Sequence, residues 1–233
     1  MGFLGLNEPN IRAVLDIAEE IMHSGKTLDV EYLYNISKKK LNISRRILLD
    51  IIDFLLGNHV LVEGTRFTRD EILENTYRAQ IWKLIETQGG VHFSFIKKHV
   101  FFETPDNPGS PGQLLWHLGL LLKFKYIKRC KSRNYTVFMP STLDEKIGIA
   151  CFLMNDSVNL NILKLFLQQP SVRKTDVYKD SSEARDTVHY RIKSLIECGF
   201  IKVDQANEDE LQLQKEKRDV VAKAFQYREE HGE

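Results

Sequence analysis

Four apolar positions recur three times along the chain with identical spacing between them. The central copy consists of Leu114, Leu118, Leu121 and Ile127, the upstream copy of Leu48, Ile52, Leu55 and Leu61, and the downstream copy of Val188, Ile192, Leu195 and Ile201. The first three positions of each copy have the spacing of one helix face, and the fourth belongs to an apolar pair typical of the start of a strand. A frame repeated in this way indicates three successive units of similar structure.

The central copy lies in the stretch from Ser110 to Pro140, where the pattern is clearest. Ser110 can cap a helix, and Pro111 suits the first helical position because its missing N–H would have no partner there. The chain then changes to Tyr126-Ile127 and to the run 135–138, whose β-branched and aromatic residues favour strands. A helix followed by a two-stranded hairpin is the sequence pattern of a winged-helix domain.

The predicted fold is therefore mainly α-helical with small β-hairpin wings, an α+β class made of three tandem winged-helix domains and a C-terminal helix. The expected boundaries are 1–70, 71–142 and 143–213 for the three domains and 214–233 for the terminal helix. Helices are expected at 10–23, 27–40, 45–57, 70–85, 95–99, 111–123, 160–167, 183–198 and 213–230, a short helix or turn at 171–178, and hairpins at 60–68, 126–138 and around 204–210. Ser44 is the expected cap of the helix at 45–57, and the run 180–182 that of the helix at 183–198.

The terminal helix has only a narrow apolar stripe, formed by Val220, Val221, Ala224 and Phe225. A stripe of this width either packs on its own domain or pairs with a second copy of the chain. A homodimer is therefore one of two interpretations that the sequence leaves open.

Composition excludes several classes of protein. The 233 residues are 42% hydrophobic and 28% charged, which is ordinary for a globular chain. The longest candidate for a membrane span, Ile47 to Leu56, is interrupted by Asp50 and Asp53. Met1 to Asn10 lacks the basic region that precedes the apolar part of a secretory signal. We therefore expect neither a membrane span nor a signal peptide.

The sequence shows no pattern that points to catalysis. Cys130, Cys151 and Cys198 are scattered, so neither a disulfide framework nor a metal site is expected, and a reducing, cytoplasmic location is favoured. A glycine-rich phosphate loop, an HExxH motif and a nucleophile elbow are all missing, and the seven histidines are dispersed. The prediction is a protein that is not an enzyme and that uses no metal or cofactor.

The net charge of +1 is unevenly distributed along the chain. Residues 71–142 carry ten Lys and Arg against five Asp and Glu, whereas acidic residues outnumber basic ones in 1–70 and in 143–233. Lys128, Arg129, Lys131 and Arg133 lie together in the expected middle hairpin. The middle segment is thus the one whose charge suits a polyanion.

Four motifs of the middle segment resemble those of a known family: Tyr77-Arg78-x-x-Ile81, Gly90-x-His92-Phe93-Ser94-x-Ile96, Gly112-x-Leu114-x-Trp116-His117-Leu118-x-x-Leu121 and Tyr135-x-x-Phe138-x-Pro140. Over residues 72–140 the chain resembles archaeal winged-helix transcriptional regulators, which carry two or more such domains in tandem. The resemblance implies duplex DNA as the partner, with the third helix in the major groove and the hairpin along the backbone. The chain departs from the family in its proline-containing loop at 103–109 and in Trp116, where a tyrosine is more usual.

The third helix and the hairpin of the middle segment provide the candidate DNA contacts. Helical geometry places Gly112, Trp116, Gly119, Leu120 and Lys123 outward, with Gln113 on the flank. Gln113 can reach an adenine edge, and Trp116 or Leu120 can touch a thymine methyl, while the hairpin cations suit phosphates. The predicted DNA-binding residues are Gln113, Trp116, Lys123, Lys128, Arg129, Lys131 and Arg133.

A protein partner is the alternative to DNA. The equivalent helices of the other two units place carboxylates outward, Asp50 and Asp53 in the first and Asp186 and Glu197 in the third, and the third hairpin, 204–210, is acidic. These carboxylates would repel phosphates. Tandem winged helices also build non-enzymatic protein-interaction scaffolds, such as ESCRT-II-type membrane-remodelling complexes and polymerase-associated factors, and outward apolar residues such as Trp116 and Leu120 favour that interpretation.

Overall fold

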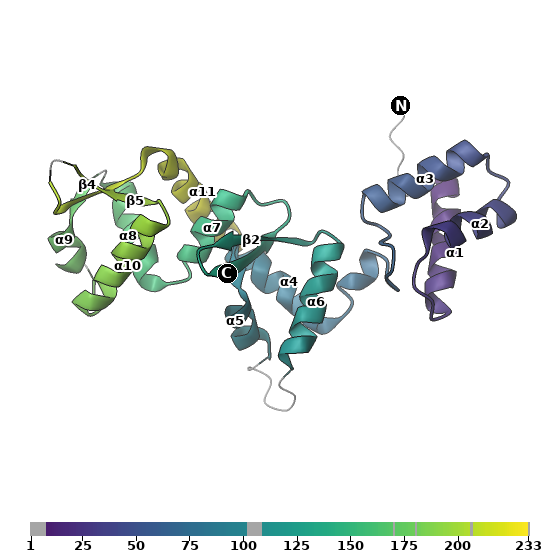
Figure 1. The fold of residues 1–233 in the computed structure, drawn as a ribbon, viewed down its shortest axis with the longest axis horizontal. Coiled ribbons are helices and arrows are strands. Elements are labelled where there is room, and N and C mark those ends of the chain that lie inside the picture. The colour runs from purple at the N-terminus through teal and green to yellow at the C-terminus, as the bar shows by residue number, and fades with distance from the viewer. Residues whose placement is uncertain (1–7, 102–108, 170, 180, 206, 233) are drawn as a thin grey trace. The chain divides into compact units, whose positions relative to one another are not determined.

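Figure 1 shows the computed structural model of the protein, which describes residues 8–101, 109–169, 171–179, 181–205 and 207–232. In this part of the chain the fold is mainly helical with two three-stranded antiparallel sheets, which confirms the predicted α+β class. The chain divides into two compact units, one of Met1–Gln80 with Gly112–Tyr126 and one of Ile81–Pro111 with Ile127–Glu233. This division runs through the segment 71–142.

Three helices form the N-terminal core of the first unit: α1 (Pro9–His23), α2 (Val30–Lys40) and α3 (Arg45–Gly57). Asp29 accepts a hydrogen bond from the Tyr32 amide at 2.7 Å, and Ser44 accepts one from the Ile47 amide at 3.4 Å, so α2 and α3 both begin at side-chain caps. The buried residues of these helices pack into one cluster that includes Ile11, Val14, Leu33, Leu48, Ile52, Leu55 and Leu61. The repeat positions of the upstream copy thus lie in this core.

The hairpin expected at 60–68 is reduced to a single bridge between Leu61 and Thr68. The Thr65 amide donates to Val62 O at 3.2 Å across a turn in which Gly64 has a φ of 72°, a conformation that favours glycine. The residues of this turn are therefore not available for further backbone pairing between the two strands. The first hairpin is therefore too short to extend a wing.

The predicted helix at 70–85 is wrong at its start. A 3-10 turn, η1 (Asp70–Ile72), comes first, and α4 (Thr76–Gln88) begins after a break. Asn75 explains the break, because its Oδ1 accepts from the Arg78 amide at 3.2 Å and so competes with a continuous helix. Arg69 links this region to the end of α6 (Pro111–Lys123): its guanidinium lies 4.6 Å from the Tyr126 ring centre, and the Tyr126 hydroxyl donates to Arg69 O at 3.0 Å.

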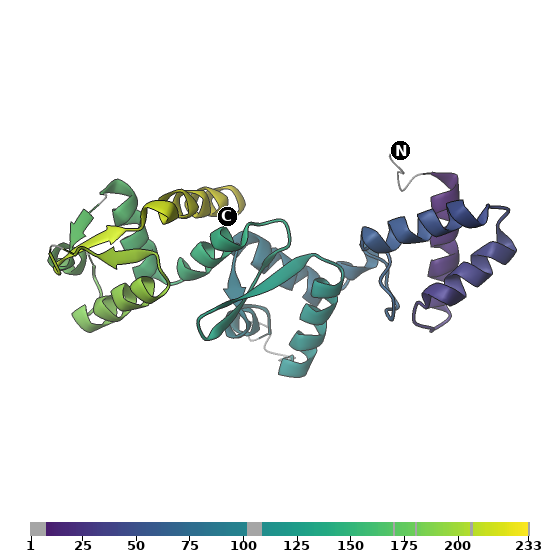
Figure 2. The same ribbon diagram turned by 45° about the horizontal axis from the view of Figure 1, so that its top comes forward.

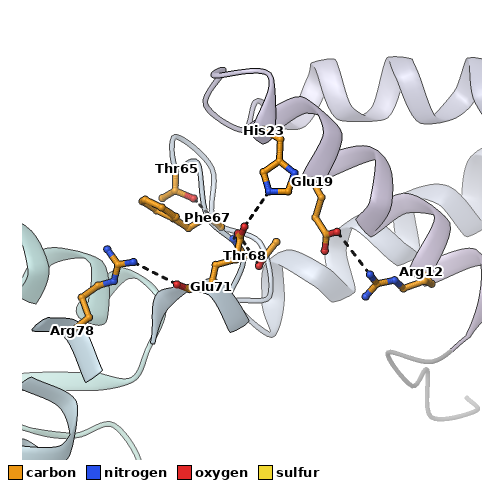
Figure 3. A network of polar contacts seen from close by, with 8 residues as sticks. All are labelled: Arg12, Glu19, His23, Thr65, Phe67, Thr68, Glu71 and Arg78. Carbon is orange, nitrogen blue, oxygen red and sulfur yellow. Dashed lines mark hydrogen bonds and ion pairs between the residues drawn. The ribbon is translucent and has the colours of Figure 1, made fainter. Parts of the chain in front are cut away.

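Glu71 is the centre of a polar network in the first unit (Figure 3). His23 Nε2 lies 3.2 Å from Glu71 Oε1, and the Thr68 amide and hydroxyl donate to Oε2 at 2.6 Å and 3.0 Å. Burial raises the pKa of Glu71, but the Thr68 hydrogen bonds and His23 outweigh it and hold that pKa below its ordinary value. Arg78 donates to Glu71 O at 3.4 Å, so the network ties α1 and η1 to the start of α4.

The second unit begins with a sheet in the order β1-β3-β2, formed by β1 (Val91–His92), β2 (Ile127–Ser132) and β3 (Tyr135–Pro140). The strands β2 and β3 form the predicted middle hairpin, pairing from Ile127 with Pro140 to Ser132 with Tyr135. The helix expected at 95–99 starts earlier, as α5 (Phe93–Ile96), and continues as a π-helical turn at Lys97–Phe101. Most of the loop expected at 103–109 lies outside the described residues.

The rest of the second unit contains α7 (Glu145–Leu153), α8 (Ser157–Gln168), α9 (Lys174–Lys179) and α10 (Arg185–Glu197) with a second sheet. That sheet has the order β4-β6-β5, formed by β4 (Ser171–Arg173), β5 (Ile201–Val203) and β6 (Glu210–Leu213). Three predictions need correction. Helix α7 was not expected, the first residues of 171–178 form a strand, and α10 begins at Arg185 after Ala184, not after a cap at 180–182.

The terminal helix α11 (Lys215–His231) packs on α7 within the same chain (Figure 2). Val221 and Ala224 are fully buried there. The Tyr227 hydroxyl donates to Glu86 O at 2.8 Å, and Arg228 donates to Cys151 O at 3.3 Å and to Asn155 Oδ1 at 3.1 Å. Of the two interpretations of this helix, the structure supports packing on its own chain. The helix that it contacts, α7, lies far before it in the sequence.

Candidate nucleic-acid interface

The middle hairpin carries four of the predicted DNA-binding residues, and the three on β2 are divided between its two faces. Side chains alternate along β2, so Arg129 and Lys131 share one face while Lys128 lies on the other. Arg129 and Lys131 are exposed, whereas Lys128 is half-buried. Neither strand of the hairpin contains an Asp or Glu. One face of β2 is therefore cationic and without an acidic neighbour on its own hairpin.

Lys128 lies on the β2 face that is turned toward other parts of the second unit. Burial raises the pKa of Cys130 on this face, and Glu145 raises it further while Lys128 lowers it. Glu145, at the start of α7, and Lys128 therefore both lie within electrostatic range of Cys130. Because Lys128 is half-buried, it is less accessible to an anion than Arg129 or Lys131.

Arg133 stands at the turn of the hairpin and is held by α10. Its Nη1 donates to Ser194 Oγ at 2.8 Å, and its Nη2 forms an ion pair with Glu197. Both side chains of this pair are partly exposed. Glu197 was expected to face outward from α10, and it is exposed there. It lies next to the middle hairpin, where it offsets the charge of Arg133.

The remaining predicted residues lie on α6 in the first unit. Gln113, Trp116 and Lys123 are all exposed, and Trp116 has 53% of its surface accessible. Leu120, which was expected to face outward, is buried at 8% exposure. Leu115 is exposed instead, at 59%. The outward face of α6 is thus rotated slightly from the predicted one, because both Leu120 and Leu121 are needed to fill the core.

Trp116 has a cationic neighbour on its inner side. The Arg78 guanidinium lies 5.7 Å from the Trp116 ring centre and 5.0 Å from the Phe67 ring centre. His117 follows Trp116, contacts its ring edge and is 2% exposed. Burial, with a smaller effect of Arg78, lowers the pKa of His117 to about 4, so this imidazole is neutral at physiological pH.

The predicted residues therefore form two groups. Gln113, Trp116 and Lys123 share the exposed side of α6 in the first unit, and the cations at 128–133 belong to the hairpin of the second unit. Within the hairpin, the structure leaves Arg129 and Lys131 most accessible to an anion. The predicted set did not include the exposed Leu115. The sequence feature that could have indicated it is its place beside Trp116 on a helix rich in leucine.

Large apolar residues are also exposed on the helices that correspond to α6 in the other two copies of the repeat. Ile47 and Leu49 on α3 are 48% and 40% exposed, and Tyr190 on α10 is 59% exposed. Tyr190 occupies the same place between Val188 and Ile192 that Trp116 occupies between Leu114 and Leu118. By contrast, the third hairpin presents the exposed carboxylates of Glu208 and Asp209.

The cysteines and other possible metal ligands complete the chemistry of the chain. Burial raises the pKa of Cys151 to about 12, and it also raises the pKa of Cys130 and of Cys198, so all three thiols are protonated at neutral pH. Among the residues that the structure describes, no cluster of three His, Cys, Asp or Glu side chains could hold a metal ion. None of the helices in the described ranges combines the length and apolar character needed to cross a bilayer.

Comparison with known proteins gives no further assignment. No family model matches the chain, and no curated protein matches it.

Proposed function

We propose that this chain is a non-enzymatic, DNA-binding protein of the transcriptional-regulator type, and that its three repeated segments are winged-helix domains. Each segment contains a helix, α3, α6 or α10, that is followed by an apolar pair at the start of a bridge or hairpin. The three free cysteines suit a reducing compartment, so we place the protein in the cytoplasm.

The observation that carries the proposal is the exposed pair Arg129 and Lys131 on a hairpin without carboxylates. Cations on an extended hairpin can follow the phosphates of a duplex, and each phosphate that they neutralise releases a condensed counterion. The adjoining sequence strengthens the field, because residues 109–143 contain no Asp or Glu. Arg129 and Lys131 would therefore supply backbone contact. Lys128 and Arg133 would contribute less, because Lys128 is half-buried and Arg133 is paired with Glu197.

Sequence readout would come from α6 of the middle segment. Gln113 lies near the N-terminus of that helix, where an amide can pair with the edge of an adenine. Trp116 is exposed on the same side and can contact a thymine methyl, while Lys123 reaches the backbone. In this account α3 and α10 do not read bases, because their outward residues include Asp50, Asp53 and Asp186.

A salt titration of duplex binding tests the proposal. Observed affinity should fall with salt, and the double substitution of Arg129 and Lys131 by Ala should make the slope of log affinity against log salt shallower by about 2, at about 0.9 for each lost phosphate contact. The matched control replaces two exposed lysines of other helices, Lys39→Ala with Lys164→Ala, and should leave the slope unchanged. Absence of duplex binding at low salt, or equal slopes for the two double variants, would refute the proposal.

A protein-interaction scaffold is the second candidate, and the exposed apolar residues on α3, α6 and α10 favour it. Exposed aromatic side chains are enriched at protein interfaces, and Trp116 and Tyr190 occupy equivalent repeat positions. The substitution Trp116→Ser separates the two functions. Loss of duplex binding in this variant supports the DNA interface, whereas a wild-type chain that ignores duplex but binds a protein partner through Trp116 supports the scaffold.

A further inference from the structure

A pocket of about 240 Å³ lies in the second unit, where the tip of the middle hairpin meets the starts of α7 and α11 and the end of α10. Four cationic residues line it, and they come from three parts of the fold: Lys131 and Arg133 from the hairpin, Lys146 from α7 and Lys217 from α11. Within the described part of the chain, Glu197 is the one carboxylate in the lining. Folding thus gathers positive charges that are far apart in the sequence.

The carboxylate of the pocket is already engaged, whereas three of the cations are not. Glu197 forms an ion pair with Arg133. None of the ion pairs among the described residues includes Lys131, Lys146 or Lys217. The lining therefore carries an excess of three positive charges, all of them on lysine.

The acidic residues next to these lysines in the sequence do not line the pocket. Asp144 caps the first turn of α7 by accepting from two backbone amides. Glu145 raises the pKa of Cys130, which lies outside the lining, and Glu216 is exposed at the start of α11. These carboxylates weaken the positive potential at the pocket without entering it.

Lys217 is held at the pocket by an aromatic contact. Its ammonium lies 5.1 Å from the ring centre of Phe200, a buried residue that also lines the pocket, and the Lys217 side chain is half-buried. Because this side chain is already ordered, less conformational entropy is lost when it contacts a ligand. Lys131 and Lys146 are exposed and can turn toward the same ligand.

The charge pattern selects the class of ligand. Like charges that are gathered in one place repel one another, and an anion with several charges relieves this repulsion better than an anion with one. Ammonium groups are compact donors that suit the oxygens of phosphate.

We propose that this pocket binds a phosphate group, with Lys131, Lys146 and Lys217 donating to its oxygens while Arg133 retains its pair with Glu197. Such a group can come from a small phosphorylated molecule or from the backbone of a duplex, and the experiment separates these two sources. The proposal does not rest on the proposed DNA binding, because the pocket and its charge are present whether or not a duplex binds.

Calorimetry of the full chain at low ionic strength tests the pocket, with pyrophosphate as the probe and acetate as a comparison anion of single charge. Low ionic strength is needed because salt screens interactions between exposed charges. Pyrophosphate should bind with a dissociation constant at or below about 1 mM, and acetate should bind at least about tenfold more weakly.

Two variants with opposite expected effects locate the binding. Lys146→Gln combined with Lys217→Gln should weaken pyrophosphate binding at least about tenfold, since two charge-assisted contacts are lost. Glu197→Gln should strengthen it about threefold, because the only carboxylate of the described lining is neutralised and Arg133 is released.

The matched control is Lys39→Gln combined with Lys164→Gln, which removes the same charge from exposed positions of α2 and α8 and should leave the dissociation constant unchanged. The proposal is overturned if pyrophosphate does not bind at millimolar concentration, if acetate binds as tightly, or if the control and the Lys146 and Lys217 double variant bind pyrophosphate equally well.

Duplex binding by the same two double variants identifies the source of the phosphate. Equal duplex affinities assign the pocket to small phosphorylated molecules, and a selective loss in the Lys146 and Lys217 variant assigns it to the duplex backbone as well; each result supports a phosphate site. The pyrophosphate measurements use no nucleic acid. Their failure would therefore leave the salt titration of duplex binding unaffected, and a chain that ignores duplex would still be tested by pyrophosphate.

Discussion

The buried side chain of His117 affects how the stability of the fold depends on pH. It is 2% exposed, contacts the rings of Tyr77 and Trp116, and has no hydrogen-bond partner for either ring nitrogen within the described residues. A protonated imidazole in this place would be both desolvated and close to Arg78, so the folded protein keeps it neutral. The surroundings of His117 therefore suit an apolar contact better than a charged or hydrogen-bonded side chain.

This environment predicts acid sensitivity. The pKa of His117 is about 4 in the folded protein against 6.5 for an unperturbed histidine. Between these values the unfolded chain binds the proton first, so stability is full above pH 6.5 and is lost as the pH falls toward 4. At pH 5 the loss from this residue amounts to about 2 kcal/mol, at 1.36 kcal/mol for each unit.

Urea unfolding at pH 7 and pH 5 checks the prediction in the wild type and in His117→Leu. The leucine variant should be about as stable as the wild type at pH 7, because an imidazole without partners is replaced by an apolar group of similar size. It should lose about 2 kcal/mol less on going to pH 5. His92, whose pKa is also lowered by burial, is present in both proteins and cancels in the comparison. Equal losses in the two proteins would contradict the assignment.

At the scale of the elements, the capping residues explain most of the agreement between sequence and structure. Ser44 and Pro111 mark the starts of α3 and α6, and the apolar frame places Leu48, Leu118 and Ile192 in cores. Local chemistry of this kind can be predicted from sequence because it depends on neighbouring residues alone.

The errors occur where distant parts of the chain decide the structure. Helix α7 has apolar residues on every side, since it is covered by both the first sheet and α11, and so it lacks the one-sided stripe that would identify it. Leu120 looks outward from the periodicity of α6 but is needed in the core. The pairing of Arg133 with Glu197, 64 residues later, has no signature in the sequence.

The start of α10 provides a test at this scale. Its N-cap is Ala184, whose φ and ψ of −58° and 140° are extended but whose side chain cannot accept a hydrogen bond. Ala184→Asp should therefore stabilise the protein by about 1 kcal/mol, since an N-cap carboxylate can accept from the free amides of the first turn. Asp144→Ala should do the opposite at α7, where Asp144 accepts from the Lys146 and Ile147 amides. Chemical denaturation measures both, and a destabilising Ala184→Asp would contradict an N-cap at residue 184.

At the scale of the whole molecule, the third segment differs from the middle hairpin in charge and packs against it. The third segment contacts the middle hairpin through the Arg133–Glu197 pair, and the terminal helix α11 contacts the end of α4 through Tyr227. Both belong to the same compact unit as that hairpin. The third segment's own hairpin is acidic and its outward carboxylate Glu197 neutralises one cation of the middle hairpin. If the middle hairpin binds DNA as proposed, this arrangement suits the third segment as a support for the cationic face of β2 better than as a DNA contact of its own.

The central proposal is that the cationic middle hairpin binds duplex DNA, and amide hydrogen exchange of the full chain with and without duplex at low salt tests it most directly. Bound duplex should slow exchange in residues 111–140 and leave residues 201–213 of the acidic sheet unchanged. Slowed exchange that avoids 127–140, or that is confined to the third segment, would contradict the account.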